Sequence, residues 1–143
     1  MQVRDLMSEE VCITSPSDTI QQAATLMLGL DVGMLPVAEN DRLIGMISDR
    51  DIAVRAVAHG RDFTTPVRDV MTEDVRYCFE HQDADDVARN MASIQVRRLP
   101  VVNDQKRLVG ILSLSDIANF ADEDRSLAPT LRGISRPGGE HHQ

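Results

Sequence analysis

The sequence predicts an α+β fold built from two tandem repeats, each with the element order β-α-β-β-α. The nine residues VRDLMSEEV at 3–11 return as VRDVMTEDV at 67–75, with conservative changes only. Each copy is followed by apolar residues at helical spacing, and then by two short apolar stretches joined by a polar turn. Landmarks that recur in the same order along both halves indicate a duplicated structural unit.

Each repeat begins with a short extended stretch, expected at about 11–14 and 75–79, and continues with an amphipathic helix. Pro16-Ser17-Asp18 and Gln82-Asp83 provide turn and cap residues just before these helices. The buried helix faces are predicted from i, i+3, i+4, i+7 spacing. They consist of Ile20, Ala23, Ala24 and Met27 in the first repeat, and of Ala84, Val87, Ala88 and Met91 in the second.

Two strands and a closing helix complete each repeat. The strands are expected at about 34–38 and 43–47, and again at 98–102 and 108–112, joined by the turns ENDR and NDQKR. The closing helices begin at Ser48 and Ser113. A repeat of about sixty residues buries too little surface to cover both faces of its helices, so we expect the two repeats to pack together.

The predicted boundaries are 1–62 for the first repeat and 63–122 for the second. Residues 123–143 have scattered Pro and Gly and no apolar periodicity, which predicts a flexible C-terminal tail. His141 and His142 lie in this tail without partners at metal-ligand spacing, so no metal site is predicted.

Composition limits the function. Of the 143 residues 42% are apolar, and with no Trp, one Tyr and three Phe the core must be aliphatic. The net charge of −8 argues against nucleic-acid binding, which needs a basic face. No signal-peptide pattern and no apolar run of membrane-spanning length are present, so we expect a cytoplasmic protein with no membrane partner. Cys12 and Cys78 are expected to be reduced thiols.

The paired VRD-x-M segments, the paired Leu-Pro-Val segments and the paired glycine-to-aspartate motifs together resemble the tandem CBS-domain module. The last motif reads GMISDRD at 45–51 and GILSLSD at 110–116, and the resemblance covers residues 1–122. It implies a pseudo-two-fold pair of repeats that often dimerises. It also implies that clefts between the repeats bind adenosine-containing ligands such as AMP, ADP or ATP, and sometimes S-adenosylmethionine or NAD.

The Ser-x-x-Asp motif has two compatible interpretations. A serine at a helix N-cap with an acid three residues later is typical of a capping box. An aspartate in a first helical turn can also accept hydrogen bonds from both hydroxyls of a ribose, and the resemblance implies this role for Asp51 and Asp116. Gly45 and Gly110 either permit close approach of a ligand or simply start a strand.

The resemblance places the adenine base near main-chain groups around Ile13-Thr14 and Tyr77-Cys78. Phosphates need cations, and here the repeats differ, since Arg97-Arg98 in the second repeat match Gly33-Met34 in the first. Arginine suits phosphate because its planar fork binds two oxygens. The alternative for this pair is a solvated strand end that forms surface ion pairs. Arg50 and Arg55 are lesser phosphate candidates.

Two unequal ligand sites are therefore predicted. The stronger comprises Ser48, Asp51, Arg97, Arg98, Tyr77 and Cys78. The weaker comprises Ser113, Asp116, Ile13, Thr14, Gly33 and Met34.

The predicted function is that of a stand-alone sensor that binds an adenine nucleotide as regulatory ligand, needs no cofactor, forms a homodimer and acts on an unidentified regulated protein. The alternative is a protein-interaction module with empty clefts, in which both Ser-x-x-Asp motifs serve only as caps. An enzyme is not expected, because His59 and His81 fall in different elements and no catalytic triad or phosphate-loop pattern is present.

Overall fold

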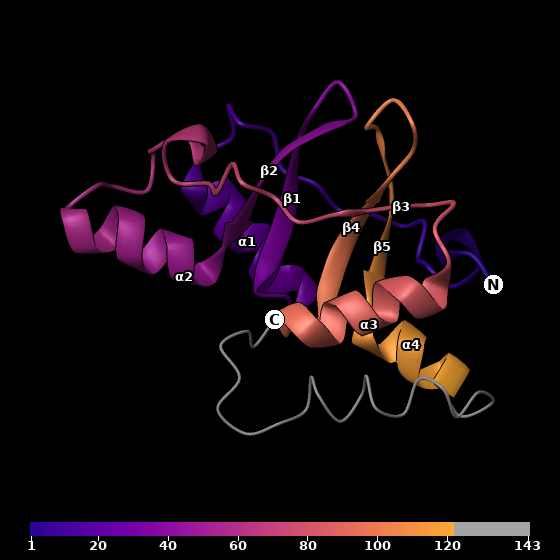
Figure 1. Ribbon diagram of the computed structural model, residues 1–143. Coiled ribbons are helices and arrows are strands. Elements are labelled where there is room, and N and C mark those ends of the chain that lie inside the picture. The colour runs from indigo at the N-terminus through magenta and orange to yellow at the C-terminus, as the bar shows by residue number, and fades with distance from the viewer. Residues whose placement is uncertain (122–143) are drawn as a thin grey trace. The chain divides into compact units, whose positions relative to one another are not determined.

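The computed structural model describes residues 1–121 (Figure 1). The tail predicted at 123–143, with His141 and His142, lies outside the described residues. The chain forms two compact units. The central unit is Cys12–Val75, and the terminal unit combines Met1–Val11 with the described residues from Arg76 to Ala121. Each unit has its own hydrophobic core and is described by itself.

The central unit holds one helix, one hairpin and a closing helix of mixed type. Helix α1 (Ile20–Leu30) begins with a capping box between Thr19 and Gln22. Strands β1 (Met34–Glu39) and β2 (Arg42–Ser48) are antiparallel, and Asn40 and Asp41 between them adopt positive φ angles. The closing helix starts as α2 (Asp49–Asp51), continues as a π-helical turn (Ile52–Ala56) and ends in a 3-10 turn (Val57–His59). A further 3-10 turn spans Val67–Asp69.

The terminal unit repeats this arrangement with one more strand. Its elements in chain order are a 3-10 turn (Val3–Asp5), β3 (Cys78–Phe79), α3 (Ala84–Ile94), β4 (Arg98–Val102), β5 (Leu108–Ser113) and α4 (Leu114–Ala121). The sheet order is β3-β4-β5, with β3 parallel to β4 and β4 antiparallel to β5.

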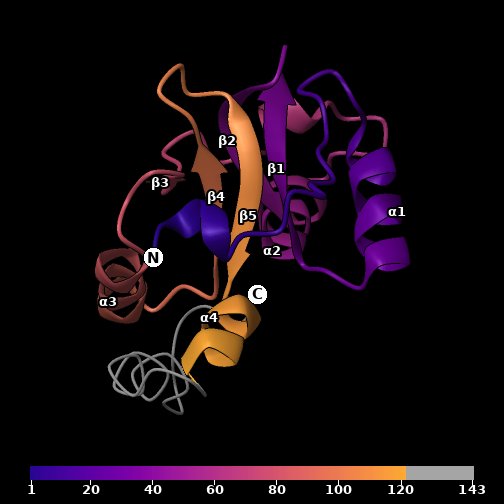
Figure 2. The same ribbon diagram turned by 90° about the vertical axis from the view of Figure 1, so that its right-hand side faces the viewer.

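The predicted α+β fold with two tandem repeats is confirmed, and the element order holds except at the first extended stretch. The two extended stretches, however, behave differently. Residues 75–79 contain β3, whereas 11–14 makes a single parallel bridge between Thr14 and Val37 instead of a strand. Figure 2 shows α1 lying alongside β1, and the 3-10 turn near the N-terminus, drawn in indigo, beside β4 and β5.

The compact units divide the chain differently from the repeats predicted at 1–62 and 63–122, because each VRD-x-M segment packs on the other repeat. The segment at 3–7 lies in the terminal unit, where Ser8 bridges to Ile111. The segment at 67–71 lies in the central unit, where Met46 bridges to Thr72. Each hairpin is therefore paired with the VRD-x-M segment of the other repeat.

The glycine of each hairpin makes this contact possible. A Cβ atom on Gly45 would lie 2.8 Å from Met71 Sδ and 2.9 Å from the main-chain oxygen of Thr72. On Gly110 it would lie 2.6 Å from Met7 Sδ and 2.9 Å from the main-chain oxygen of Ser8. The close neighbour of each glycine is thus the VRD-x-M segment and its methionine, which fills the space that the glycine leaves.

Both cores are aliphatic, as the composition predicts. No aromatic side chain is among the buried hydrophobic residues of 1–119, the range in which side-chain burial is described. The central core has Leu35, Val37 and Ile47 at its heart, and the terminal core is centred on Leu99 and Leu112. The second strand of each hairpin packs into a core and ends at the serine of the Ser-x-x-Asp motif, so the core fixes the position of the motif.

We expect Gly45→Ala to lower the free energy of unfolding by about 1–3 kcal/mol, because the new methyl group overpacks a site bounded by main chain. Met71 can move, but the Thr72 oxygen is held by a 2.9 Å hydrogen bond from Met46 N. Gly29→Ala in α1 is the matched control, since nothing lies within 4 Å of a Cβ there. That variant should gain about 0.5–1 kcal/mol. Urea unfolding checks both, and equal effects would contradict the close-approach role.

Candidate functional site

Ser48 and Asp51 form a complete capping box at the start of α2. Asp51 N donates to Ser48 Oγ at 3.0 Å, and Ser48 N donates to Asp51 Oδ2 at 2.9 Å. The capping interpretation is therefore confirmed. In residues 1–121 the second carboxylate oxygen, Oδ1, accepts no hydrogen bond, and the Ser48 hydroxyl donates none. Capping thus leaves one acceptor and one donor of this motif open to a ligand.

The second copy of the motif is bonded more tightly to itself. Ser113 N donates to Asp116 Oδ2 at 2.9 Å, and Asp116 N donates to Ser113 Oγ at 3.3 Å. In addition, the Ser113 hydroxyl lies 3.0 Å from the same Oδ2 and 2.8 Å from Ser115 Oγ. The Ser113 hydroxyl is already engaged, whereas that of Ser48 is not, so the two motifs differ locally.

Each motif lies beside the beginning of the first strand of its own hairpin. In the central unit Met34 pairs with Ser48, and Asp49 N donates to Gly33 O at 2.9 Å. Ser48 and Asp51 are thus brought together with Gly33 and Met34, which sequence reasoning assigned to the weaker site.

In the terminal unit Arg98 pairs with Ser113, and Leu114 N donates to Arg97 O at 2.7 Å. Arg97 and Arg98 are thus brought together with Ser113 and Asp116. The predicted grouping of the arginine pair with the first motif joins residues of both units and stays a prediction.

Within the described residues, the arginine pair does not form the surface ion pairs that were its alternative role. Among the described residues neither Arg97 nor Arg98 makes a salt bridge. Arg98 is exposed, while Arg97 is half-buried and its Nε is fully buried without a hydrogen-bond acceptor. A buried N–H without a partner costs about 1–3 kcal/mol, so Arg97 has an unsatisfied donor that an oxyanion can use.

The segment Ile13-Thr14, which was expected to contact the adenine base, has Ile13 exposed to solvent and Thr14 buried. Thr14 is buried, and its main chain is fully paired with β1 through Pro36 O and Ala38 N, both at 3.0 Å. Its hydroxyl donates to Asp18 Oδ2 at 3.0 Å. Ile13 is 38% exposed, and its main-chain groups form no hydrogen bond within residues 1–121. Of these two residues, only Ile13 therefore has main-chain groups without a hydrogen bond within residues 1–121.

The corresponding segment of the second repeat has a buried thiol on one face. Cys78 Sγ lies 3.9 Å from Pro100 O, and burial raises the pKa of the thiol to about 12. The Cys78 side chain therefore belongs to the core, and only its neighbours can meet a ligand.

The other face of this segment carries a row of rings. Tyr77 and Phe79 meet edge to face at 5.7 Å, Phe79 stacks on His81 at 5.5 Å, and Lys106 Nζ lies 5.3 Å from the Tyr77 ring centre. Sequence reasoning missed this row, although alternate aromatic positions at 77, 79 and 81 are the period-two signal of one strand face.

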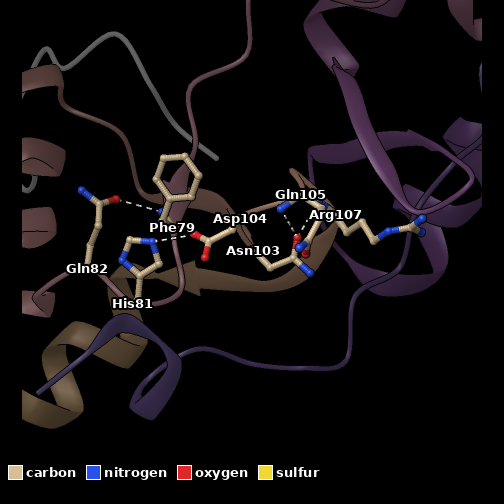
Figure 3. Close-up of polar contacts among 7 residues, drawn as sticks. All are labelled: Phe79, His81, Gln82, Asn103, Asp104, Gln105 and Arg107. Atoms are coloured by element: carbon tan, nitrogen blue, oxygen red, sulfur yellow. Dashed lines mark hydrogen bonds and ion pairs between the residues drawn. The ribbon is translucent and has the colours of Figure 1, made fainter.

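Polar contacts fix this segment to the turn between β4 and β5 (Figure 3). His81 Nε2 lies 3.0 Å from Asp104 Oδ1, and Gln82 Oε1 accepts from Phe79 N at 2.8 Å. Asn103 closes the turn by accepting two main-chain N–H groups at 3.0 Å. These hydrogen bonds therefore fix the positions of Phe79 and His81 in the row of rings.

The other candidates contribute less. Arg50 is exposed, whereas Arg55 uses its Nη1 to donate to the main-chain oxygens of Val70 and Met71, at 3.2 and 2.9 Å. Over residues 1–121 no three His, Cys, Asp or Glu side chains gather as metal ligands. In the same range no helix is long and apolar enough to cross a bilayer.

Comparison with known proteins supports the family resemblance. The sequence profile of the CBS domain matches twice, at residues 3–57 and 67–123. The CBS domain-containing protein YhcV of Bacillus subtilis (strain 168) is 44% identical over 133 residues, which cover 93% of this chain and 94% of YhcV.

Two solved structures resemble the fold and contain adenosine-based ligands. CBSX2 in complex with AMP has a TM-score of 0.75 at 25% identity, covering 87% of this chain and 98% of that one. The CBS domain pair of MJ0100, in complex with 5′-methylthioadenosine and S-adenosyl-L-methionine, has a TM-score of 0.69 at 30% identity, covering 86% and 97%.

The two thiols should differ in reactivity. Because thiolate is the reactive form, the raised pKa and burial of Cys78 protect it, whereas Cys12 is only half-buried. We expect iodoacetamide at pH 8 to label Cys12 first, and Cys78 only after urea unfolding. Mass spectrometry of Cys12→Ser, which retains only the protected thiol, provides the control. Rapid labelling of that variant in the native state would refute the assignment.

Proposed function

The chain belongs to the CBS domain family as a tandem regulatory pair, and we propose that its regulatory ligand is an adenosine-containing molecule, with AMP, ADP or ATP as the leading candidates. The observation that carries the proposal is the open half of the first Ser-x-x-Asp motif. Asp51 caps its helix with one carboxylate oxygen, which leaves the other unpaired within residues 1–121.

This oxygen suits the ribose of the ligand. Hydrogen bonds to a charged acceptor contribute about 1.5–3 kcal/mol each, and the exposed first turn of a helix favours negative groups. Ser48 adds a hydroxyl that donates to nothing within residues 1–121. Asp116 offers the same oxygen, but Ser113 offers no free hydroxyl proton, which supports unequal binding by the two motifs.

The phosphates of the ligand are assigned to the arginine pair. Arg97 has a buried Nε without an acceptor, and Arg98 is an exposed cation beside it. The grouping of this pair with Asp51 for one ligand, and of Asp116 with Gly33 and Met34 for a second, weaker one, is part of the proposal. The base is assigned to main-chain groups near Ile13 and Tyr77.

We further propose a homodimer that acts on another protein. A ligand can shift the conformation of such a module only by its difference in affinity between two states. A nucleotide-insensitive interaction module is the second candidate, and the observation that favours it is that both capping boxes are complete without a ligand.

Nucleotide binding is testable through ribose recognition. AMP at a hundredfold excess over its Kd should add about 2.7 kcal/mol to the stability measured by thermal shift. By calorimetry, 2′-deoxy-AMP should bind about tenfold more weakly than AMP, because one hydrogen bond to a carboxylate is missing.

Asp51→Ala should abolish most of this discrimination, while the matched variant Asp116→Ala should preserve most of it. The quantity compared is the ratio of the affinities for AMP and 2′-deoxy-AMP within each variant. Loss of the helix cap, which costs about 1 kcal/mol of stability, affects both ligands equally and leaves this ratio unchanged. Lack of response to AMP, ADP, ATP, NAD and S-adenosylmethionine would favour the interaction module. Equal effects of the two aspartate variants would contradict the asymmetry.

The phosphate assignment has its own test. Arg97→Gln should weaken AMP binding about tenfold and leave adenosine binding nearly unchanged, because only the phosphate uses the guanidinium. Arg42→Gln, which removes the charge of an exposed arginine on β2, controls for the change in net charge. If AMP and adenosine lose affinity equally in Arg97→Gln, the arginine supports the fold and does not bind phosphate.

A further inference from the structure

The closing helix of the central unit ends beside a pocket lined by basic side chains. This open cavity of about 430 Å³ is lined by Arg55, His59, Arg61 and Asp69, and is called the arginine pocket below. All four residues belong to Cys12–Val75. Two guanidiniums and an imidazole thus meet a single carboxylate, in a chain with a net charge of −8. A local excess of positive charge in an acidic protein attracts anions to one place.

Arg55 is held in position by one of its nitrogens. Its Nη1 donates to the main-chain oxygens of Val70 and Met71, at 3.2 and 2.9 Å. The Nε and Nη2 groups make no hydrogen bond among residues 1–121. A guanidinium that is fixed in this way loses little conformational entropy when its remaining donors bind a ligand.

Two of the carbonyl groups at the helix end are already bonded to main-chain N–H groups, which reduces their repulsion of an anion. Free carbonyls give a helix C-terminus partial negative charge. Here Gly60 adopts a left-handed conformation (φ 74°), and Gly60 N donates to Val57 O at 3.0 Å. Arg61 N donates to Ala56 O at 3.0 Å. These bonds satisfy two terminal carbonyls and fix the main chain from which the Arg61 side chain extends.

The remaining side chains are weakly engaged. Arg61 Nη1 and Asp69 Oδ2 lie 3.7 Å apart, and the two side chains are 45% and 44% exposed. An ion pair this long and exposed contributes little, so a more highly charged anion can replace Asp69 as the partner of Arg61. His59 is exposed and has no partner within the described residues.

We propose that the arginine pocket binds a phosphate group, as inorganic phosphate or as a phosphate ester of a small organic molecule. Arg55 and Arg61 supply the charge-assisted hydrogen bonds, and His59 adds one donor. The cavity lies within the range of small-molecule sites and exceeds the size of a bare phosphate ion, which leaves room for an organic part. The proposal shares no residue with the Ser-x-x-Asp motifs and does not depend on nucleotide binding there.

The test is a titration with inorganic phosphate and with glycerol 3-phosphate at constant ionic strength, followed by calorimetry and by the arginine Nε–H signals in NMR spectra. We expect saturable binding that shifts the signals of Arg55 and Arg61. Arg61→Gln should weaken it about tenfold. Asp69→Asn should strengthen it about two- to fivefold, because the competing carboxylate is gone. Since misfolding does not raise affinity, the Asp69 variant separates ligand binding from a structural role.

Arg42→Gln makes the same change in net charge at an exposed arginine of the same unit and should leave both titrations unchanged. An equal loss of phosphate affinity in Arg42→Gln and Arg61→Gln would mean that the net charge of the protein, and not the pocket, determines binding, which would overturn the proposal. Signals that shift without saturation would also overturn it. So would binding that Arg97→Gln removes and Arg61→Gln leaves intact, because the phosphate would then bind in the terminal unit.

Discussion

The contact between each VRD-x-M segment and the glycine of a hairpin is the constraint on which the rest of the structure depends. Met46 and Thr72 exchange main-chain hydrogen bonds at 2.9 and 2.8 Å, and Ser8 and Ile111 do the same at 2.9 Å. A Cβ on the neighbouring Gly45 or Gly110 would lie 2.9 Å from the main-chain oxygen of Thr72 or Ser8, so the two segments pack this closely because both positions are glycine. The hairpin held by this contact leads directly into the Ser-x-x-Asp motif, so the geometry of the motif follows from it.

Within this frame, one motif performs two tasks because a carboxylate has two oxygens. The oxygen that caps the helix fixes the rotamer of Asp51, and a fixed rotamer presents the other oxygen without further loss of entropy. The second copy has the same cap, but the hydroxyl of its serine, Ser113, donates to Asp116 of the same motif. The two copies of the motif thus share the same capping hydrogen bonds. They differ in the proton of the serine hydroxyl, which Ser113 donates to Asp116 and Ser48 does not donate within residues 1–121.

The sequence predicts local features well because they depend on nearby residues. Spacing alone predicts the helix that begins at Ile20 and the cap between Ser48 and Asp51, whose partners lie within one turn. It does not predict that Thr72 approaches Gly45, since that contact joins positions far apart in the chain. For the same reason the arginine pocket was not foreseen as a unit, because Asp69 reaches it from beyond a loop. The row of rings at Tyr77, Phe79 and His81 was predictable from its alternation along the sequence.

The interleaved assembly of the two units also has a consequence for synthesis on the ribosome. The central unit is one uninterrupted stretch, Cys12–Val75, so it can fold as soon as residue 75 has left the exit tunnel. The terminal unit needs Met1–Val11 together with strands that are translated last. Met1–Val11 is therefore translated before the central unit but can fold only after it, and until then the apolar side chains of Val3, Leu6 and Met7 have no core to enter. A nascent chain of this topology carries these exposed apolar side chains until β5 has been translated, which is a demand on chaperones rather than on the finished fold.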